Sequence, residues 1–296
     1  MEFITKLKKV TERIKINEPM SAHTSIQIGG PADYFIEVEN ESQLKRLIRL
    51  CKNSKIPYFL VGGGSNLLVK DGGIRGVVLK LTDDFEHIVA DKRKVIIGAG
   101  IALPHLLMEV SNLGLGGLEF LTGIPGTFGG AIFMNAGAYG ASILERVNWL
   151  KIMDSSARVK TILKKDLRFS YRKSNLNGYI ILEGELELQE SKRLKVEGKM
   201  KGLLKLRENT QPLYTKSFGC MFKNPEKRNA GELIRKSGLA DLRIGDAKIS
   251  EKHPNFIENL GRAKARDVLM IIERVKEEVM QRFEVPLEEE VIITGS

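Results

Sequence analysis

The chain has 296 residues, of which 42% are hydrophobic and 28% are charged, and its formal net charge is +10. This length and composition are typical of a globular protein with one large core or two to three smaller ones. No apolar run of about 18 residues occurs, so no transmembrane helix and no membrane partner are expected. The charged N-terminal segment lacks the apolar stretch of a signal peptide. The two cysteines exclude a disulfide framework and fit a reducing, cytoplasmic setting.

The positive charge makes a nucleic-acid binder one hypothesis to weigh. However, the basic residues are spread along the chain and interleaved with acidic ones, and aromatic residues make up only 6%. Nucleic-acid-binding proteins tend to concentrate charge on one stripe or arm with aromatic platforms. We therefore expect no nucleic-acid partner and a monomeric protein. The CxxC and HExxH patterns are absent, so no metal site is expected.

The first predicted elements form a β-α-β unit. Residues 34–38 are predicted to be a strand, and Asn40 is predicted to start a helix with Gln43 as its capping-box partner. Residues 58–61 are predicted to be a buried strand that leads into a glycine-rich turn. The helix between the strands has an apolar face at helical spacing, which makes Cys51 a predicted core residue; the face consists of Leu44, Leu47, Ile48 and Cys51.

The remaining elements alternate between strands and helices and predict an α+β fold. The predicted strands are residues 76–81, 95–100, 147–152, 159–162, 179–188 and 255–257. The predicted helices are residues 103–112 and 231–236 and a long helix from Ala263, and residues 194–209 are predicted to be a charged helix or a linker. The segment from residue 114 to 140 is rich in glycine and is predicted to be a loop.

Two glycine-rich segments suggest a bound cofactor. The first, Gly62-Gly63-Gly64-Ser65-Asn66-Leu67, directly follows a buried strand. The second includes Gly126, Thr127 and Gly130. Glycines allow the backbone N–H groups to approach an anion closely, and their entropic cost makes such density unusual in a plain core. Neither segment has the Rossmann or P-loop spacing, so a tight turn is the alternative for each taken alone.

Several motifs occur in the order found in one enzyme family. After an opening segment at residues 24–32, the chain reads VGGGSNLLV, GLEFLTGIPGTFGGAIFMNAGAYG, FSYRKS, CMFKNP and LEEEV. In this order the chain resembles the UDP-N-acetylenolpyruvoylglucosamine reductase family (UDP-N-acetylmuramate dehydrogenases), in its shorter form. The resemblance spans nearly the whole chain.

The resemblance implies an α+β protein of three domains. Residues 1–82 and 83–200 would be the two lobes of an FAD-binding module of the vanillyl-alcohol-oxidase/p-cresol-methylhydroxylase type, and residues 201–296 the C-terminal substrate-binding domain. FAD would be tightly but non-covalently bound. Its predicted contacts are Gly62, Gly63, Gly64, Ser65, Asn66, Leu67, Gly126, Thr127 and Gly130 at the pyrophosphate, and Asn135 and Ala136 beside the flavin.

The resemblance also implies a reaction of peptidoglycan precursor synthesis. NADPH would reduce FAD, and UDP-N-acetylglucosamine enolpyruvate would be reduced to UDP-N-acetylmuramate by hydride from flavin N5 to C3 and a proton to C2. Arg172 would hold the carboxylate, Cys220 would donate the proton where many relatives have serine, and Glu290 would assist at the enol. The residues implied to bind the substrate are Arg207, Gln211, Lys223 and Asn224.

Other readings of these residues remain open from the sequence. Without the motifs, Arg172 reads as a surface arginine, Cys220 as an inert buried cysteine, and Glu290 as part of a solvated acidic run. Within the same fold, an FAD oxidase acting on an alcohol or sugar is the alternative. A basic binding protein with an inactive flavin site is the alternative from another class.

Overall fold

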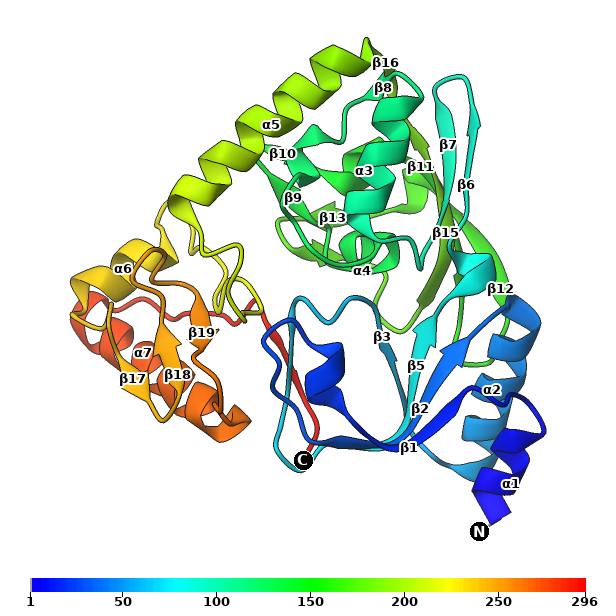
Figure 1. Cartoon of the computed structure of the whole chain (residues 1–296), viewed down its shortest axis with the longest axis horizontal. Helices are drawn as coiled ribbons and strands as arrows, with labels where there is room; N and C mark the ends of the chain where they lie inside the picture. Colours follow the sequence, from blue (N-terminus) through cyan, green and yellow to red (C-terminus); the bar gives the residue numbers. More distant parts are fainter. Residues whose placement is uncertain (1) are drawn as a thin grey trace. The chain divides into compact units, whose positions relative to one another are not determined.

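The computed structural model describes residues 2–296, and the chain divides into two compact units (Figure 1). Unit 1 comprises Met1–Ile16, Tyr34–Gly63 and Gly76–Leu206, whereas unit 2 comprises Asn17–Asp33, Gly64–Arg75 and Arg207–Ser296. Unit 2 is therefore built from three separate stretches of sequence. The three-domain division at residues 82 and 200 remains a prediction.

The first sheet has the strand order β1-β2-β5-β3, and most of its residues belong to unit 1. Its strands are β1 (Ile14–Pro19), β2 (Pro31–Val38), β5 (Ile74–Leu81) and β3 (Tyr58–Val61). The strands β3 and β5 run parallel. The helix α2 (Glu41–Ser54) lies between β2 and β3 in the sequence and contacts α1 (Glu2–Lys8).

The start of α2 confirms the predicted cap and corrects one detail of it. The Asn40 side chain accepts a hydrogen bond from the Gln43 N–H at 2.9 Å. The Gln43 side chain instead accepts from the N–H of Glu39, at 2.8 Å, so the reciprocal bond of the capping box reaches one residue further back. Cys51 is fully buried on the apolar face of α2, as predicted.

The second sheet of unit 1 is antiparallel and has the strand order β12-β11-β15-β7-β6. Its strands are β6 (Ile88–Asp91), β7 (Lys94–Gly98), β11 (Val147–Met153), β12 (Val159–Leu163) and β15 (Ile180–Glu187). The helix α4 (Phe128–Phe133) packs on β15 and β7, and α3 (Leu103–Asn112) follows β7 in the chain. The predicted loop at residues 114–140 thus contains a short helix.

Short elements complete unit 1. Three strand pairs connect neighbouring loops: β8 (Leu115–Gly116) with β16 (Gln189–Glu190), β9 (Gly137–Ala138) with β10 (Ala141–Ser142), and β13 (Phe169–Ser170) with β14 (Lys173–Ser174).

The 3₁₀ helices of the described residues are η1 (Met20–His23), η2 (Asp83–Phe85), η3 (Glu119–Leu121), η4 (Ile143–Arg146) and η5 (Lys164–Asp166). The long helix α5 (Arg193–Thr210) runs from unit 1 into unit 2.

Unit 2 contains a small antiparallel sheet and two helices, of which the longer packs on the sheet and the shorter packs on the longer helix. The sheet is β17 (Arg243–Ile244), β18 (Ala247–Ile249) and β19 (Ile257–Asn259), and the helices are α6 (Ala230–Lys236) and α7 (Ala265–Phe283). Figure 1 shows α7 lying across this sheet, and its predicted apolar face is buried there except for Phe283, which is half-buried. The strands β4 (Leu67–Val69) and β20 (Ile292–Thr294) form a separate parallel pair.

The predicted strand at residues 255–257 is mostly wrong. Strand β19 begins at Ile257, and Asn255 lies in a turn that the Phe256 N–H closes onto the carbonyl of His253 at 2.8 Å. Pro254 and Asn255 both lie in this turn, and Phe256 forms an isolated bridge with Cys220, so the strand starts later than predicted.

Among residues 2–296, no helix is both long and apolar enough to cross a bilayer. Within the same residues, no group of three or more His, Cys, Asp or Glu side chains is placed to hold a metal ion.

Candidate functional site

The two glycine-rich segments that were predicted to bind the cofactor contact each other through their backbones in unit 1. A Cβ atom at Gly63 would lie 2.7 Å from the Cα of Gly126, and one at Gly62 would lie 2.5 Å from Oγ1 of Thr127. A third segment joins them, because a Cβ at Gly129 would lie 2.9 Å from the Cβ of Ala99. Only glycine permits such contacts. The result is a surface of bare backbone, with Gly63 exposed.

This bare backbone fits a phosphate-bearing cofactor. Peptide N–H groups in glycine-rich turns form concave donors for anions without any cationic side chain. The side chain of Thr127 does not reach outward for this purpose, since its Oγ1 accepts a hydrogen bond from the Gly130 N–H at 3.3 Å and caps α4. The cofactor contacts at Gly62, Gly63, Gly126 and Gly130 would therefore be made by main-chain atoms.

Gly64, Ser65, Asn66 and Leu67 belong to unit 2. Gly64 has a φ of 61°, which explains why a glycine stands there. Asn66 donates from its side-chain amide to the carbonyl of Glu290 at 2.9 Å, and Leu67 lies in β4, paired with Ile292. The structure therefore uses Asn66 and Leu67 to fix the C-terminal strand.

Arg172 sits at the tip of the hairpin formed by β13 and β14 in unit 1. Its φ of 53° places a non-glycine residue in the left-handed region, a conformation that costs free energy and is found at functional positions. One guanidinium nitrogen donates to the carbonyl of Gly137 at 3.2 Å, and the group lies 5.2 Å from the centre of the Tyr171 ring. Asn135 donates to the carbonyl of Ser170 at 3.0 Å.

Asn135 therefore has a role that the sequence did not indicate. Its side chain is 3% exposed, and besides the bond to Ser170 it accepts one from the Leu144 N–H at 3.3 Å. It ties the segment after α4 to the hairpin that carries Arg172. Ala136 is buried next to it.

In unit 2, the backbone segment that contains Cys220 runs alongside the segment that contains Glu290. The segment from Cys220 to Lys223 pairs with the segment that contains Glu290: the Glu290 N–H donates to the Met221 carbonyl at 2.8 Å, and the Lys223 N–H donates to the Glu288 carbonyl at 2.9 Å. Cys220 is half-buried, and so is Glu290. A thiol and a carboxylate are thus held on adjacent backbone segments, which suits proton transfer to one substrate.

Asn255 is a site-supporting residue that sequence reasoning missed. It is 2% exposed, accepts from the Phe222 N–H at 3.0 Å and donates to the Phe222 carbonyl at 2.7 Å. Its own carbonyl accepts from the Met221 N–H at 2.8 Å. In the sequence, the one indication is that Asn255 and Phe256 follow a His-Pro pair. This pattern predicts a turn but not the segment to which Asn255 bonds.

The acidic run at residues 288–290 separates into three different environments. Glu288 pairs with the Lys223 ammonium at 2.5 Å, which leaves that lysine tied to an acidic neighbour. Glu289 pairs with Lys276 of α7 at 2.8 Å. Burial raises the pKa of the Glu289 carboxyl, but the hydrogen bond and charge of Lys276 outweigh it, so the pKa lies below its usual range. Glu289 is therefore paired with α7, whereas the Glu290 N–H pairs with the Met221 carbonyl of the Cys220 segment.

The four predicted substrate residues are all in unit 2 but have different surroundings. Asn224 accepts a hydrogen bond from the Ala230 N–H at 3.0 Å and so helps to start α6. Arg207 is 8% exposed and donates to the Gln211 side chain at 3.2 Å. Of these residues, Lys223 and Asn224 continue the Cys220 segment, whereas Arg207 and Gln211 lie at the end of α5.

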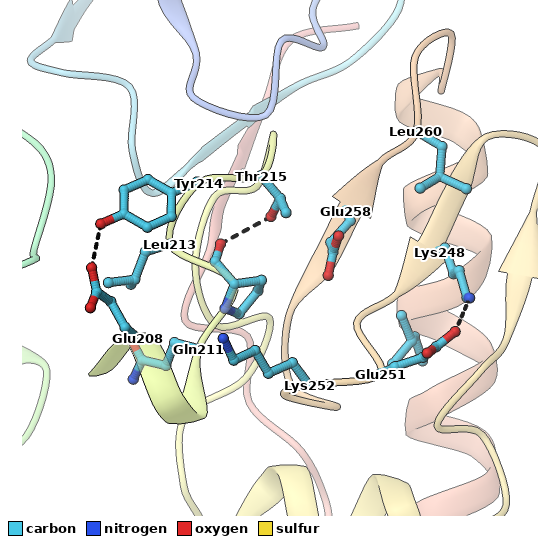
Figure 2. A pocket seen from close by; sticks show the side chains of 12 residues that line it. Glu208, Gln211, Leu213, Tyr214, Thr215, Lys248, Glu251, Lys252, Glu258 and Leu260 are labelled. Atoms are coloured by element: carbon cyan, nitrogen blue, oxygen red, sulfur yellow. Dashed lines mark hydrogen bonds and ion pairs between the residues drawn. The ribbon is translucent and has the colours of Figure 1, made fainter. Parts of the chain in front are cut away.

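Gln211 lines a pocket of about 460 Å³ between the end of α5 and the sheet of unit 2 (Figure 2). Charged side chains of both signs surround it, among them Glu208, Lys252 and Glu258. The Tyr214 hydroxyl donates to Glu208 at 2.5 Å, and Lys248 pairs with Glu251. Figure 2 shows these two pairs on opposite sides of the pocket. Neither Cys220 nor Glu290 is among its lining residues.

His253 is held neutral more readily than an exposed histidine. Burial lowers its pKa, and the charge of Arg235 lowers it further. Its ring lies edge-on to Phe256, with centroids 4.6 Å apart, and its Nδ1 is buried without a hydrogen-bond partner in the described part of the chain. These contacts indicate a packing role.

Comparison with known proteins links both parts of the chain to described families. Residues 211–294 match the family described as UDP-N-acetylenolpyruvoylglucosamine reductase, C-terminal domain. Residues 32–162 match the FAD binding domain family. These matches confirm the predicted combination of an FAD-binding module with a separate C-terminal domain.

Individual proteins are similar over almost the whole chain. The UDP-N-acetylenolpyruvoylglucosamine reductase 2 of Symbiobacterium thermophilum is 45% identical, over 96% of this chain and 92% of that protein. The crystal structure of the UDP-N-acetylenolpyruvylglucosamine reductase from Thermus caldophilus is 37% identical, covers 95% of this chain and 97% of that one, and superposes with a TM-score of 0.82.

A more distant structure shares the fold alone. BBE-like 1 of Physcomitrella patens is 16% identical, covers 64% of this chain and 44% of its own length, and superposes with a TM-score of 0.50.

Proposed function

This chain belongs to the UDP-N-acetylenolpyruvoylglucosamine reductase family, and from that premise we propose that it is an FAD-dependent enzyme of peptidoglycan precursor synthesis. Its substrate is UDP-N-acetylglucosamine enolpyruvate, its product is UDP-N-acetylmuramate, and NADPH is the electron donor. Bound FAD supplies the hydride that adds to C3 of the enolpyruvyl group.

The glycine-rich backbone holds the cofactor without a covalent link. Gly62, Gly63 and Gly126 present main-chain N–H groups to the pyrophosphate, and Gly130 lets it approach the start of α4, where Thr127 caps the helix by accepting from the Gly130 N–H. Gly64, Ser65, Asn66 and Leu67 extend the binding segment, while Asn135 and Ala136 stand beside the flavin.

Arg172 binds the carboxylate of the enolpyruvyl group. When hydride adds to C3, negative charge develops at C2 and spreads into this carboxylate. A planar guanidinium donates two parallel hydrogen bonds to a carboxylate and stabilises that charge more strongly than a lysine. The hydrogen bond to Gly137 and the Asn135 bond to the hairpin fix the direction of the Arg172 side chain.

Cys220 completes the reduction by giving its Sγ proton to C2. The new C2–H bond neutralises the negative charge, and the thiolate that remains takes a proton from water before the next turnover. An ordinary thiol has a pKa of about 8.5, so it is protonated at neutral pH yet far more acidic than the serine found in many relatives. Glu290, on the neighbouring segment, assists at the enol. Arg207, Gln211, Lys223 and Asn224 bind the nucleotide part.

We further propose that the protein acts as a cytoplasmic monomer without a nucleic-acid or membrane partner. The interleaving of acidic and basic residues along the sequence supports the absence of a nucleic-acid partner. Light scattering coupled to size-exclusion chromatography tests the oligomeric state, and a mass of twice 33.1 kDa would contradict the monomer.

The observation that supports the proposed chemistry most directly is the backbone pairing of Glu290 with Met221, which brings the Glu290 segment alongside the Cys220 segment. The test is an anaerobic titration followed by visible absorption. We expect a flavin spectrum that bleaches with NADPH and returns when UDP-N-acetylglucosamine enolpyruvate is added.

Two variants test the proton donor. Cys220→Ala should still bleach, but its reoxidation should slow about 10²–10⁴-fold, the usual contribution of a general acid. Cys220→Ser should retain measurable reoxidation. A colourless protein that cannot be loaded with FAD would refute the flavoenzyme, and a yellow protein reoxidised only by oxygen would indicate an oxidase.

A further inference from the structure

The peptide of Phe222 is held by a side chain where a neighbouring strand would normally hold it. Asn255 accepts from the Phe222 N–H at 3.0 Å and donates to the Phe222 carbonyl at 2.7 Å, so both atoms of its amide are used on one residue. Asn255 is 2% exposed and Phe222 is 1% exposed. Water therefore cannot replace these bonds if the side chain is removed.

The opposite edge of the same segment carries the acid. Phe222 and Glu289 form an antiparallel bridge, and the Glu290 N–H donates to the Met221 carbonyl at 2.8 Å. The Cys220 segment thus lies between residues 255–256 on one side and residues 288–290 on the other, and Cys220 itself bridges Phe256. A shift of the Phe222 peptide would move Cys220 relative to Glu290.

We propose that Asn255 is a positioning residue that sets the placement of the Cys220 thiol relative to the Glu290 carboxylate. This inference rests on the proposed function, in which both groups act on the enol. Asn255 touches neither substrate nor cofactor in this role. It acts through the backbone, because an amide has a separate acceptor oxygen and donor nitrogen and can bond to the N–H and the carbonyl of one residue at once.

The experiment compares Asn255→Ala and the isosteric Asn255→Asp with a matched control, Asn259→Ala. Asn259 is also a buried asparagine of unit 2, 6% exposed, and donates to the carbonyl of Ile26 at 3.0 Å, but it does not bond to the Cys220 segment. Thermal unfolding first establishes that the compared variants are folded. If Asn255→Ala does not fold, Asn255→Asp takes its place in the comparison. The aspartate keeps an acceptor for the Phe222 N–H but has no N–H to donate to the Phe222 carbonyl.

The first readout separates the two half-reactions. We expect bleaching by NADPH to proceed at the wild-type rate in the Asn255 variants, and reoxidation by the enolpyruvyl substrate to slow about tenfold or more, because small misplacements of reacting groups have large effects on rate. Asn259→Ala should keep both rates. If the role of Asn255 were purely structural, Asn255→Ala and Asn259→Ala would change the two rates equally.

The second readout does not depend on turnover. The rate at which iodoacetamide alkylates Cys220, followed by mass spectrometry of its peptide, should rise severalfold in the Asn255 variants and stay unchanged in Asn259→Ala. Unchanged alkylation together with unchanged reoxidation in the Asn255 variants would overturn the inference. Failure of the wild type to reoxidise with the substrate would instead refute the proposed function, and the alkylation rates would still decide the role of Asn255.

Discussion

At the scale of single residues, the chain contains two cysteines with opposite properties. Cys51 is fully buried in the core of unit 1, and burial raises the pKa of its thiol to about 11. Cys220 is half-buried, on a segment that pairs with the segment of Glu290. A thiol reacts as its thiolate, so exposure and pKa together decide which cysteine a reagent attacks.

This contrast predicts selective inactivation. At pH 8, iodoacetamide should modify Cys220 and abolish the substrate-dependent reoxidation, while Cys51 stays protonated and unmodified. Mass spectrometry of the two cysteine peptides alongside the activity measurement checks this. A Cys220→Ser protein should resist the reagent, and inactivation of that variant at the same rate would contradict the prediction.

His253 predicts a pH dependence of stability. Its pKa in the folded protein lies below the ordinary value near 6.5, so as the pH falls below 6.5 the unfolded chain binds more protons at this residue than the folded protein does. The stability that the neutral ring contributes is therefore present above about pH 6.5 and is lost on acidification.

The measurement is urea unfolding at pH 7.5 and pH 5.5. The wild type should lose more free energy of unfolding between these two pH values than His253→Gln, whose side chain does not titrate. An identical loss in the two proteins would assign the acid sensitivity to other groups.

At the scale of elements, periodic patterns in the sequence located helices well and strand pairing poorly. The helices α3 and α7 and the apolar face of α2 follow from local spacing and caps, because a helix bonds only to itself. The strands β4 and β20 were not predicted, since each has three residues and is defined by a partner more than 200 positions away. The helix α4 was also not predicted, because its segment is rich in glycine. Those glycines are needed where the backbone packs closely against neighbouring segments.

The helix α5 offers a stabilising change. Gly198 and Gly202 lie inside it, are exposed, and would place a Cβ atom in open space. Replacing an exposed helical glycine by alanine adds roughly 0.5–1 kcal/mol. The double variant Gly198→Ala/Gly202→Ala should unfold at a higher temperature by calorimetry, with unchanged turnover. A lower unfolding temperature would indicate that α5 needs flexibility at these positions.

The contact between the glycine loops predicts a loss of cofactor. In Gly63→Ala the added Cβ atom would lie 2.7 Å from the Cα of Gly126, and neither backbone can turn away as a flexible side chain would. Overpacking of this kind costs about 1–3 kcal/mol, which would weaken FAD binding roughly tenfold or more.

The ratio of flavin to protein absorbance after gel filtration measures this loss of cofactor. Gly202→Ala is the control, because its Cβ atom meets nothing within 4 Å. Full retention of FAD by Gly63→Ala would show that the loops separate without cost.

At the scale of the whole molecule, the sequence motifs identified candidate residues but not their neighbours. Arg172 belongs to unit 1, whereas Cys220 and Glu290 belong to unit 2. The pairing of Glu290 with Met221 and the bonds of Asn255 to Phe222 depend on contacts between distant segments, which no local pattern encodes. Motif order was therefore informative about family and chemistry, and uninformative about the residues that support the site.

The composition of unit 2 predicts that its C-terminal part cannot fold alone. Its hydrophobic core includes Ile26, Ile28 and Leu68, which are at most 3% exposed and come from the two earlier segments. A fragment of residues 207–296 lacks these side chains and β4, the partner of β20. Circular dichroism during heating should show no cooperative transition. A sharp unfolding transition of this fragment would contradict the prediction.

The discontinuous core of unit 2 also has a consequence for protein synthesis. Ile26, Ile28 and Leu68 leave the ribosome long before α7, against which their core is completed. At 5–20 residues per second, some 200 residues of elongation correspond to a delay of roughly 10–40 s. During that time these early apolar side chains have no native partners from the last segment. They are available to chaperones, so this enzyme should depend on chaperone capacity in the cell more than a protein whose domains are contiguous in sequence.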